Sequence, residues 1–216
     1  WRARYARNSM TGPLTIVGRS SSHFTRVARI FALELGVSHV FQPVFDLTVV
    51  DPAAYAGNPA LKIPVLVDEQ GALFGTENIC RELVRRSGTT RPVVMRGDVH
   101  DRIVTNAEEL ALHVMSAEVA LIMAKMAGGA GAAPAKLGRS IEESLRWLDE
   151  HVDVVLATLP RERALSFVEV ALFCVMTHLP FREVMDVAPF KRLGAFCAQF
   201  GERESARSTE YRFDAR

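Results

Sequence analysis

The stretch LKIPVLVDEQGALFGTENICREL, residues 61–83, carries three secondary-structure signals in immediate succession. Val65–Val67 is a short β-type run, the turn DEQG follows it, and Ala72–Phe74 can return as the second strand of a hairpin. Thr76 then stands where a helix N-cap is expected, with an acidic residue in the first turn. Pro64 lies just before the first strand, although proline has no N–H for a sheet ladder. The stretch therefore predicts a hairpin followed directly by a helix, with a proline at its entrance.

The segment before this hairpin has the pattern of a strand, a helix and a second strand. Leu14–Gly18 is a short apolar run, and the apolar residues of Phe24–Leu35 recur at helical spacing until a glycine ends the pattern. His39–Phe45 is typical of a second strand, and the turn-rich Asp51–Asn58 has room for one helical turn. The first half of the chain is therefore predicted to run β-α-β-turn-β-β-α.

The second half of the chain is predicted to be helical throughout. The loop-forming Ser87–Pro92 fits a domain boundary, and strand signals disappear beyond it. One segment, LSFVEVALFCVMTHL, is almost wholly apolar, which favours a helix buried at the centre of a bundle. Residues 10–86 are thus expected to form an α/β domain and residues 97–216 an all-helical domain, with residues 87–96 as the linker. The helices are expected at Val99–Met126, Leu137–Leu159, Leu165–Leu179 and Pro189–Phe200, with a charged tail after them.

The composition argues against several classes of function. The chain has 26 basic and 25 acidic residues and a formal net charge of +1, which gives no electrostatic basis for nucleic acid or an anionic membrane as the main partner. Charged residues interrupt the apolar runs before they reach a membrane-spanning length, so we expect a soluble protein. No stretch has the layout of a secretory signal peptide. Residues 1–9, WRARYARNS, are Arg-rich and acid-free, and we expect a cloning remnant rather than an Arg-rich targeting peptide.

The cysteines and histidines show no disulfide or metal-binding pattern. Cys80, Cys174 and Cys197 are odd in number and lie far apart without C-x-x-C spacing. They are expected to be small buried thiols in a reducing cytoplasm. The six histidines include no i, i+4 pair and no partnership with cysteine, so the sequence predicts no metal site.

Three segments together resemble the glutathione S-transferases: SSHFTRVARIFALELG, the hairpin stretch quoted above and LSFVEVALFCVMTHL. The likeness covers most of residues 14–200 and is most specific where Lys-Ile-Pro-Val-Leu, a hairpin and Thr-Glu-Asn follow in the family's order and spacing. It implies an α/β, thioredoxin-like, glutathione-binding N-terminal domain followed by an all-α helical-bundle C-terminal domain. It also implies glutathione as co-substrate, a small hydrophobic electrophile as second substrate, a role in detoxification, and a homodimer.

The resemblance assigns five residues to glutathione. The Ile63–Pro64 peptide bond would be cis, and the main chain of Ile63 would pair with the cysteinyl part of the tripeptide. Glu77 would hold the γ-glutamyl ammonium while the N–H groups of the helix start bind its carboxylate, and Lys62 would face the glycyl carboxylate. Asn78 stands where the family has serine, which changes the reach of a hydrogen-bond donor. Singly, each has a simpler explanation: a proline that begins a strand, an acidic first turn, or a solvated lysine.

Ser22 is the candidate for activating the glutathione thiol. The thiolate is the nucleophile, and a free thiol with a pKa near ~8.5 is mostly protonated at neutral pH, so a hydrogen-bond donor and a helix N-terminus beside the sulfur would help. Val17–Gly18 ends the first strand without the tyrosine of the tyrosine-using classes. Alignment with the family's Ser-Pro-Phe pattern places Ser22 beside the sulfur, with His23 in place of proline and Ser20 and Ser21 as fallbacks. Serines before a helix are also common N-caps, which is the structural alternative.

The second substrate is expected between the domains, against the first long helix of the second half. Phe24 could supply an apolar wall, and Asn106, Glu109 and His113 follow one another at i, i+3 and i+4 steps. Solvent exposure is the alternative for these three polar residues.

One further pattern, SFVE at Ser166–Glu169, fits a helix capping box and is expected to be structural.

Two classes of function remain open. The first is a serine-type glutathione transferase that transfers the thiolate to a small electrophile, or isomerises or reduces one. The second is a non-catalytic module of the same fold that binds a protein or a ligand, which the departures at Asn78 and His23 keep open. Glutaredoxin-like redox chemistry is disfavoured because no cysteine lies between Ser20 and Thr25.

Overall fold

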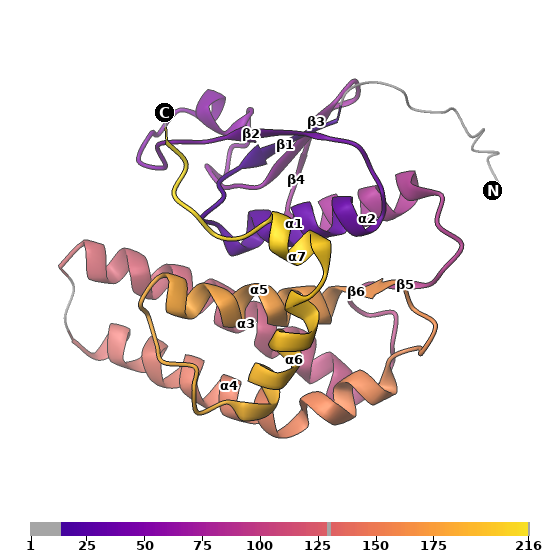
Figure 1. Ribbon diagram of the computed structural model, residues 1–216. Coiled ribbons are helices and arrows are strands. Elements are labelled where there is room, and N and C mark those ends of the chain that lie inside the picture. The colour runs from indigo at the N-terminus through magenta and orange to yellow at the C-terminus, as the bar shows by residue number, and fades with distance from the viewer. Residues whose placement is uncertain (1–13, 129–130, 216) are drawn as a thin grey trace.

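The computed structural model describes residues 14–128 and 131–215. A mixed sheet with two helices against it lies on one side of the molecule, and a layer of longer helices lies on the other (Figure 1). The predicted fold class, an α/β domain followed by a helical domain, is confirmed. Residues 1–9 lie outside the described residues, so their origin stays a prediction.

The N-terminal domain is built on a four-stranded sheet in the order β2-β1-β3-β4. Strands β1 and β2 are parallel, whereas β3 is antiparallel to both of its neighbours, β1 and β4. The observed order of elements matches the order predicted from the sequence. The elements are β1 Thr15–Gly18, α1 His23–Glu34, β2 Val40–Pro43, the 3-10 turn Pro52–Tyr55, β3 Val65–Asp68, β4 Gly71–Phe74 and α2 Thr76–Ser87.

The ends of the two N-terminal helices follow local chemistry. Helix α1 ends because Gly36 adopts a φ of +64°, and the next residue, Val37, donates its N–H back to the Ala32 carbonyl at 2.8 Å. The predicted N-cap of α2, Thr76, is wrong by one residue. The N-cap is Gly75, with a φ of +89°, which turns the chain from β4 into the helix without a side-chain cap.

The C-terminal domain is a bundle around one buried helix. Helix α5 is buried along nearly its whole length, as its apolar sequence predicts. Helix α4 begins at Ala132 rather than Leu137, because the proline of the GGAGAAP stretch lies in its first turn, where no N–H is needed. Helix α3 begins at Arg102 rather than Val99, after Asp101 caps it. The helices are α3 Arg102–Met126, α4 Ala132–Thr158, α5 Phe167–Phe181, α6 Lys191–Gly201 and α7 Glu204–Ser208.

A small parallel sheet was not predicted. Strand β5, Val93–Val94, pairs with β6, Leu165–Ser166, so residues within the predicted linker 87–96 are fastened to the helical domain. The expectation that strands end with the first domain is therefore wrong, because two-residue strands carry no periodic signal. One bond of the predicted capping box is observed, since Glu169 donates its N–H to Ser166 Oγ at 3.2 Å; the Glu169 carboxylate accepts from the Ser166 hydroxyl at 2.6 Å rather than from its main-chain N–H.

The C-terminal tail is not a free charged segment. Helix α7 lies beside α1 (Figure 1), where Arg26 of α1 donates to the Ala206 carbonyl at 2.9 Å and to Thr209 Oγ1 at 3.3 Å. Arg203 pairs with Glu34 at the other end of α1 at 2.7 Å. The tail therefore joins the two domains along one face of α1.

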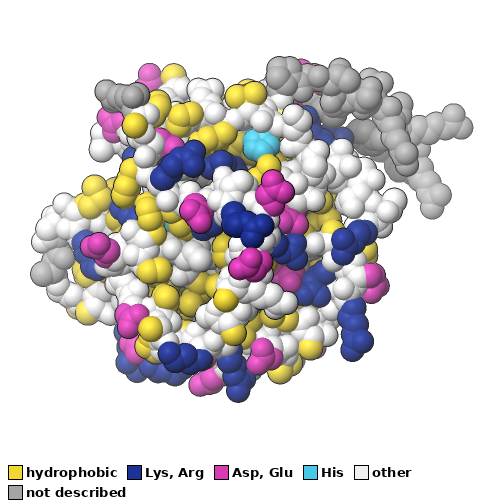
Figure 2. Space-filling view, in the orientation of Figure 1, with side chains coloured by type: hydrophobic (Ala, Val, Ile, Leu, Met, Phe, Trp, Pro, Cys, Tyr) yellow, Lys and Arg dark blue, Asp and Glu magenta, His cyan; other side chains and the backbone are white. Residues whose placement is uncertain are grey.

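On the face of the molecule shown in Figure 2, basic and acidic side chains are interspersed, and no large patch of one charge is visible. Among the described helices, none combines the length and the apolarity that crossing a bilayer requires.

Candidate functional site

Three segments that carry predicted site residues leave the sheet at the same edge. Val65, the first residue of β3, pairs with Val17 near the end of β1 and with Phe74 at the end of β4. The loop after β1, the residues before β3 and the start of α2 after β4 therefore meet at this edge. The predicted residues Ser20–Ser22, Lys62–Pro64 and Glu77–Asn78 all belong to these three segments.

Ser22 is the N-cap of α1. Its φ of −108° and ψ of 123° are extended, and its Oγ accepts the N–H of Thr25 at 3.3 Å. The structural alternative, a capping serine, is therefore confirmed, while its Oγ–H remains a donor that capping does not use. Gly18 at the end of β1 permits this tight loop, because a methyl group on it would lie 2.4 Å from Thr25 Cγ2.

Ser20 and Ser21 are buried and tied to the helical domain. The Ser20 N–H donates to Asp214 Oδ2 at 2.8 Å, and its hydroxyl is buried without a hydrogen-bonding partner. The Ser21 carbonyl accepts a hydrogen bond from His178 Nε2 at 2.9 Å. Of the three serines, only Ser22 is partly exposed.

The entrance to β3 has the predicted geometry. The Ile63–Pro64 peptide bond is cis, as the resemblance implies. The buried Asn58 donates its side-chain amide to the Lys62 carbonyl at 2.7 Å, which fixes the loop before the bond. Lys62 itself is exposed and Ile63 is half-buried.

The start of α2 has uncapped N–H groups and an acidic side chain. Glu77 Oε1 accepts from Arg81 Nη2 at 2.8 Å and from Arg81 Nε at 3.2 Å. Asn78 turns its amide back to the Phe74 carbonyl, which it reaches at 3.0 Å. Because Gly75 caps without a side chain, the first N–H groups of α2 have no side-chain cap and are available to an anion.

The polar residues expected at the second-substrate pocket have other partners. Glu109 pairs with Arg96 at 2.5 Å, and His113 Nε2 lies 3.1 Å from Ser140 Oγ of α4. Asn106 is exposed, as are the other two. Within residues 14–128 and 131–215, none of the three is hydrogen-bonded to the serine loop, residues Ser20–Ser22 after β1, and the structure does not assemble them into a pocket with it. Their predicted alternative, solvent exposure, agrees with what is observed.

Phe24 lies at the boundary of the two domains. Its ring centroid is 4.6 Å from that of His23, and the side chain is partly buried against the core. An apolar wall next to the serine loop is therefore present.

The cysteines do not offer a nucleophile. Cys80 and Cys174 are buried, and Cys197 is half-buried. Burial raises the pKa of Cys80 well above its ordinary value and raises that of Cys174 and of Cys197 to about 12. These thiols are protonated at neutral pH, which agrees with their prediction as small buried side chains.

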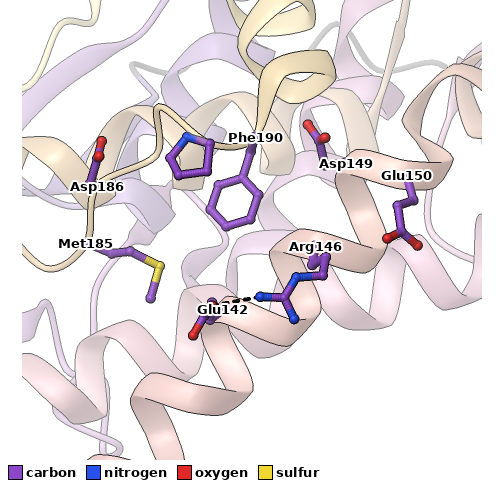
Figure 3. A pocket seen from close by; sticks show the side chains of 8 residues that line it. Glu142, Arg146, Asp149, Glu150, Met185, Asp186 and Phe190 are labelled. Carbon is purple, nitrogen blue, oxygen red and sulfur yellow. Dashed lines mark hydrogen bonds and ion pairs between the residues drawn. The ribbon is translucent and has the colours of Figure 1, made fainter.

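A separate cavity lies entirely within the helical domain. It has a volume of about 400 Å³ and opens between α4 and the segment that joins α5 to α6 (Figure 3). Arg146 at its wall pairs with Glu142 at 2.7 Å. It includes none of the predicted site residues. The lining residues are Glu142, Arg146, Asp149, Glu150, Met185, Asp186, Pro189 and Phe190.

Comparison with protein families identifies the N-terminal domain. Residues 17–91 match the family model described as glutathione S-transferase, N-terminal domain. Residues 17–91 are therefore similar in sequence to the N-terminal domain of glutathione S-transferases. The match spans β1 to α2, and so includes all three segments that meet at the edge of the sheet.

Solved structures extend the likeness to the whole chain. A glutathione S-transferase from Methylobacillus flagellatus KT with glutathione bound is 23% identical, with 92% of this chain and 100% of that chain covered and a TM-score of 0.75. A glutathione transferase family member from Pseudomonas fluorescens Pf-5, also with glutathione bound, is 21% identical over 92% and 99% of the two chains, with a TM-score of 0.76. No curated protein matches. The chain therefore has the glutathione S-transferase fold over 92% of its length.

Three side chains beside the serine loop could not be predicted from the sequence. Asp214 and His178 bind the main chain of the loop, and Glu118 lies 2.7 Å from His178. All three come from the helical half of the chain and contact residues 60 to 194 positions away. No local spacing could have indicated them.

Proposed function

We propose that the chain is a glutathione transferase that binds glutathione at the shared edge of the sheet and activates its thiol. One observation carries the proposal: Val65 pairs with both Val17 and Phe74, so the serine loop, the Ile63–Pro64 entrance and the uncapped start of α2 adjoin one another. Glutathione presents a γ-glutamyl end with a carboxylate and an ammonium, and a central cysteinyl residue with a peptide main chain and a thiol side chain. These three segments offer a helix N-terminus, an extended main chain and a hydroxyl donor in turn.

The binding roles follow from the chemistry of each group. The γ-glutamyl carboxylate would accept from the first N–H groups of α2, and Glu77 would hold the ammonium through its second carboxylate oxygen, beside Arg81. The main chain of Ile63 would pair with the cysteinyl residue, and the exposed ammonium of Lys62 would reach the glycyl carboxylate. Asn78 would take part only after releasing the Phe74 carbonyl.

The proposed catalytic group is Ser22. Its Oγ–H would donate to the glutathione sulfur at the N-terminus of α1, where the helix dipole also favours negative charge. The thiol proton leaves to solvent, the sulfur forms a bond to the electrophilic carbon, and the leaving group departs with its bonding electrons. A small apolar electrophile would approach over Phe24.

Ser22→Ala tests this role. Removing a donor that acts on the developing thiolate should lower the turnover number by roughly 100-fold, while the glutathione dissociation constant, measured by calorimetry, changes little. An activated aryl chloride serves as the electrophile. Ser140→Ala on α4 is the matched control and should leave both quantities unchanged. Equal turnover of the Ser22→Ala variant and the control would exclude Ser22 as the donor.

A non-catalytic module of the same fold is the second candidate, and three contacts favour it. Asp214 occupies the Ser20 N–H, Arg81 occupies one Glu77 oxygen, and the Asn78 amide is turned to its own main chain. This candidate predicts that millimolar glutathione neither raises the melting temperature nor retains the protein on a glutathione column. Retention together with turnover would exclude it.

The wider setting is also a proposal. The resemblance supports a cytoplasmic homodimer that acts in detoxification, with the thioredoxin-like domain of one subunit against the helical domain of the other. Light scattering on the purified protein measures the oligomeric state directly. A monomer at micromolar concentration would contradict this part.

A further inference from the structure

Three buried titratable side chains from three helices meet beneath the N-terminus of α1. His23 belongs to α1, Glu118 to α3 and His178 to α5, and none of the three residues is more than 2% exposed. His178 Nδ1 lies 2.7 Å from Glu118 Oε1 and 2.9 Å from His23 Nδ1. The second carboxylate oxygen, Oε2, lies 3.4 Å from His23 Nδ1. The Nδ1 atoms of the two histidines and the two oxygens of Glu118 thus lie close together between the domains.

Hydrogen bonding alone does not satisfy this cluster. His178 Nε2 faces the Ser21 carbonyl at 2.9 Å, and a carbonyl only accepts, so this nitrogen carries a proton. In the neutral ring, Nδ1 then has a single lone pair, yet it faces two groups at hydrogen-bonding distance. Glu118 Oε2 is buried without a hydrogen-bonding partner, and His23 Nδ1 lies 3.4 Å from it. Such groups carry a large desolvation cost unless something else neutralises them.

We propose that the cluster binds a divalent transition-metal ion, with zinc as the reference case, through His23 Nδ1, His178 Nδ1 and the carboxylate of Glu118. Imidazole nitrogen and carboxylate oxygen are the ligands that zinc takes in His₂Glu sites. Ligand atoms about 2.1 Å from a tetrahedral zinc lie roughly 3.4 Å apart. The separation of 3.4 Å already matches this value, and those of 2.7 and 2.9 Å would have to lengthen by about 0.7 and 0.5 Å.

The surroundings of the ligands suit this role. A metal-bound histidine commonly donates its outer N–H to a backbone carbonyl, which fixes the ring, and the His178–Ser21 hydrogen bond does this. A cation also supplies the counter-charge for the buried Glu118 carboxylate.

The ion would join the two domains. His23 comes from the thioredoxin-like domain and the other two ligands from the helical domain, and α1 packs on α5 while α5 packs on α3 (Figure 1). Because His178 also holds the Ser21 carbonyl, the site would position the serine loop. His23, Glu118 and His178 are thus positioning residues, and the metal is structural.

Metal content is the direct test. The full chain is purified without a metal-affinity step, stripped with a chelator, incubated with Zn²⁺ or Co²⁺, desalted and assayed by plasma mass spectrometry. We expect one ion per chain and, with Co²⁺, the visible absorption of a four-coordinate site. Glu118→Gln keeps the shape but removes the anionic ligand, and should weaken binding by roughly 10-fold or more. The matched control is Glu108→Gln. Glu108 is another buried glutamate of α3, and its carboxylate accepts the Gly97 N–H, so this variant should bind the ion as the wild type does.

The outcomes separate clearly. A wild-type chain that takes up no ion, or a Glu118→Gln variant that binds as tightly as Glu108→Gln, would overturn the site. If circular dichroism shows that Glu118→Gln is unfolded, His23→Gln takes its place with the same expectation. The assay needs no glutathione, so a metal-free chain that still binds glutathione would refute the metal site and leave the transferase proposal standing.

Discussion

Replacing Arg26 with alanine tests how the two domains hold each other. Arg26 lies on the buried side of α1 and is 4% exposed. Its guanidinium donates to Thr177 Oγ1 of α5 at 2.9 Å, to the Ala206 carbonyl of α7 at 2.9 Å, and to Thr209 Oγ1 at 3.3 Å. Aromatic rings flank it at centroid distances of 4.7 Å for Phe173 and 4.3 Å for Tyr211.

The expected cost follows from these contacts. Hydrogen bonds from a charged donor contribute about 1.5–3 kcal/mol each, and buried cation–π contacts contribute up to about 2 kcal/mol. Two effects reduce the sum. Among the described residues no carboxylate pairs with Arg26, so its charge is costly to bury. Thr177 and Thr209 keep hydrogen bonds of 2.7 Å to main-chain carbonyls after the arginine is removed. We therefore expect Arg26→Ala to lower the free energy of unfolding by about 3–4 kcal/mol.

Urea denaturation of the full chain, followed by circular dichroism, measures this loss. Arg26→Met should cost less than Arg26→Ala, because methionine keeps an apolar stem between the two rings. Arg139→Ala is the control: Arg139 is 66% exposed in its pairing with Glu142, and such surface pairs are worth less than about 1 kcal/mol. If Arg26→Ala cost no more than Arg139→Ala, the view of Arg26 as the link between the domains would be refuted.

Three further perturbations test other parts of the chain. Burial raises the pKa of Glu169, but hydrogen bonds, chiefly from Arg163, lower it more, so that it lies below its ordinary value. The carboxylate therefore stabilises the fold at pH values above the unfolded-state pKa. This stabilisation is lost as the pH falls through the folded-state pKa. Glu169→Gln should accordingly cost about 2–4 kcal/mol at pH 7 and much less in acid, and a penalty that persists unchanged below about pH 3 would contradict this. Gly18→Ala places a methyl group 2.4 Å from Thr25 Cγ2 and should cost about 1–3 kcal/mol by thermal denaturation, whereas an unchanged melting temperature would show that the loop is not closely packed. Asn78→Ser should tighten glutathione binding in calorimetry by about 3- to 10-fold by releasing the Phe74 carbonyl contact, and weaker binding would argue against a glutathione-facing role.

The fold could be predicted where the signal was local. The hairpin of residues 65–74 and helix α1 were found because turn residues and apolar periods lie within a few positions of one another. The misplaced start of α2 has a local cause too: Thr76 is a good capping residue, but Gly75 alone can adopt the positive φ that the turn out of β4 requires. Strands β5 and β6 could not be found, since each has two residues and gains its hydrogen bonds only from a partner about seventy positions away.

The residues of the candidate site could likewise be predicted only where the sequence signal was local. Ser22, Pro64 and Glu77 lie in segments whose order and spacing mark them, and the sheet register brings those segments to one edge. Asn106, Glu109 and His113 were proposed from helical spacing alone, which identifies a shared face but not the direction in which that face points. In the sequence, His23 shows only a departure from a family pattern, because its partner His178 lies 155 residues away.

Helix α1 explains why the serine loop depends on the whole chain. The loop's main chain is held at two points from the helical half: Asp214 accepts the Ser20 N–H, and His178 donates to the Ser21 carbonyl. One turn further along, Arg26 anchors the same helix to α5 and α7. A hydroxyl that stabilises a thiolate must be held in place before the sulfur arrives. The thioredoxin-like domain supplies the groups of the proposed glutathione site, but the helical domain fixes the loop that presents Ser22.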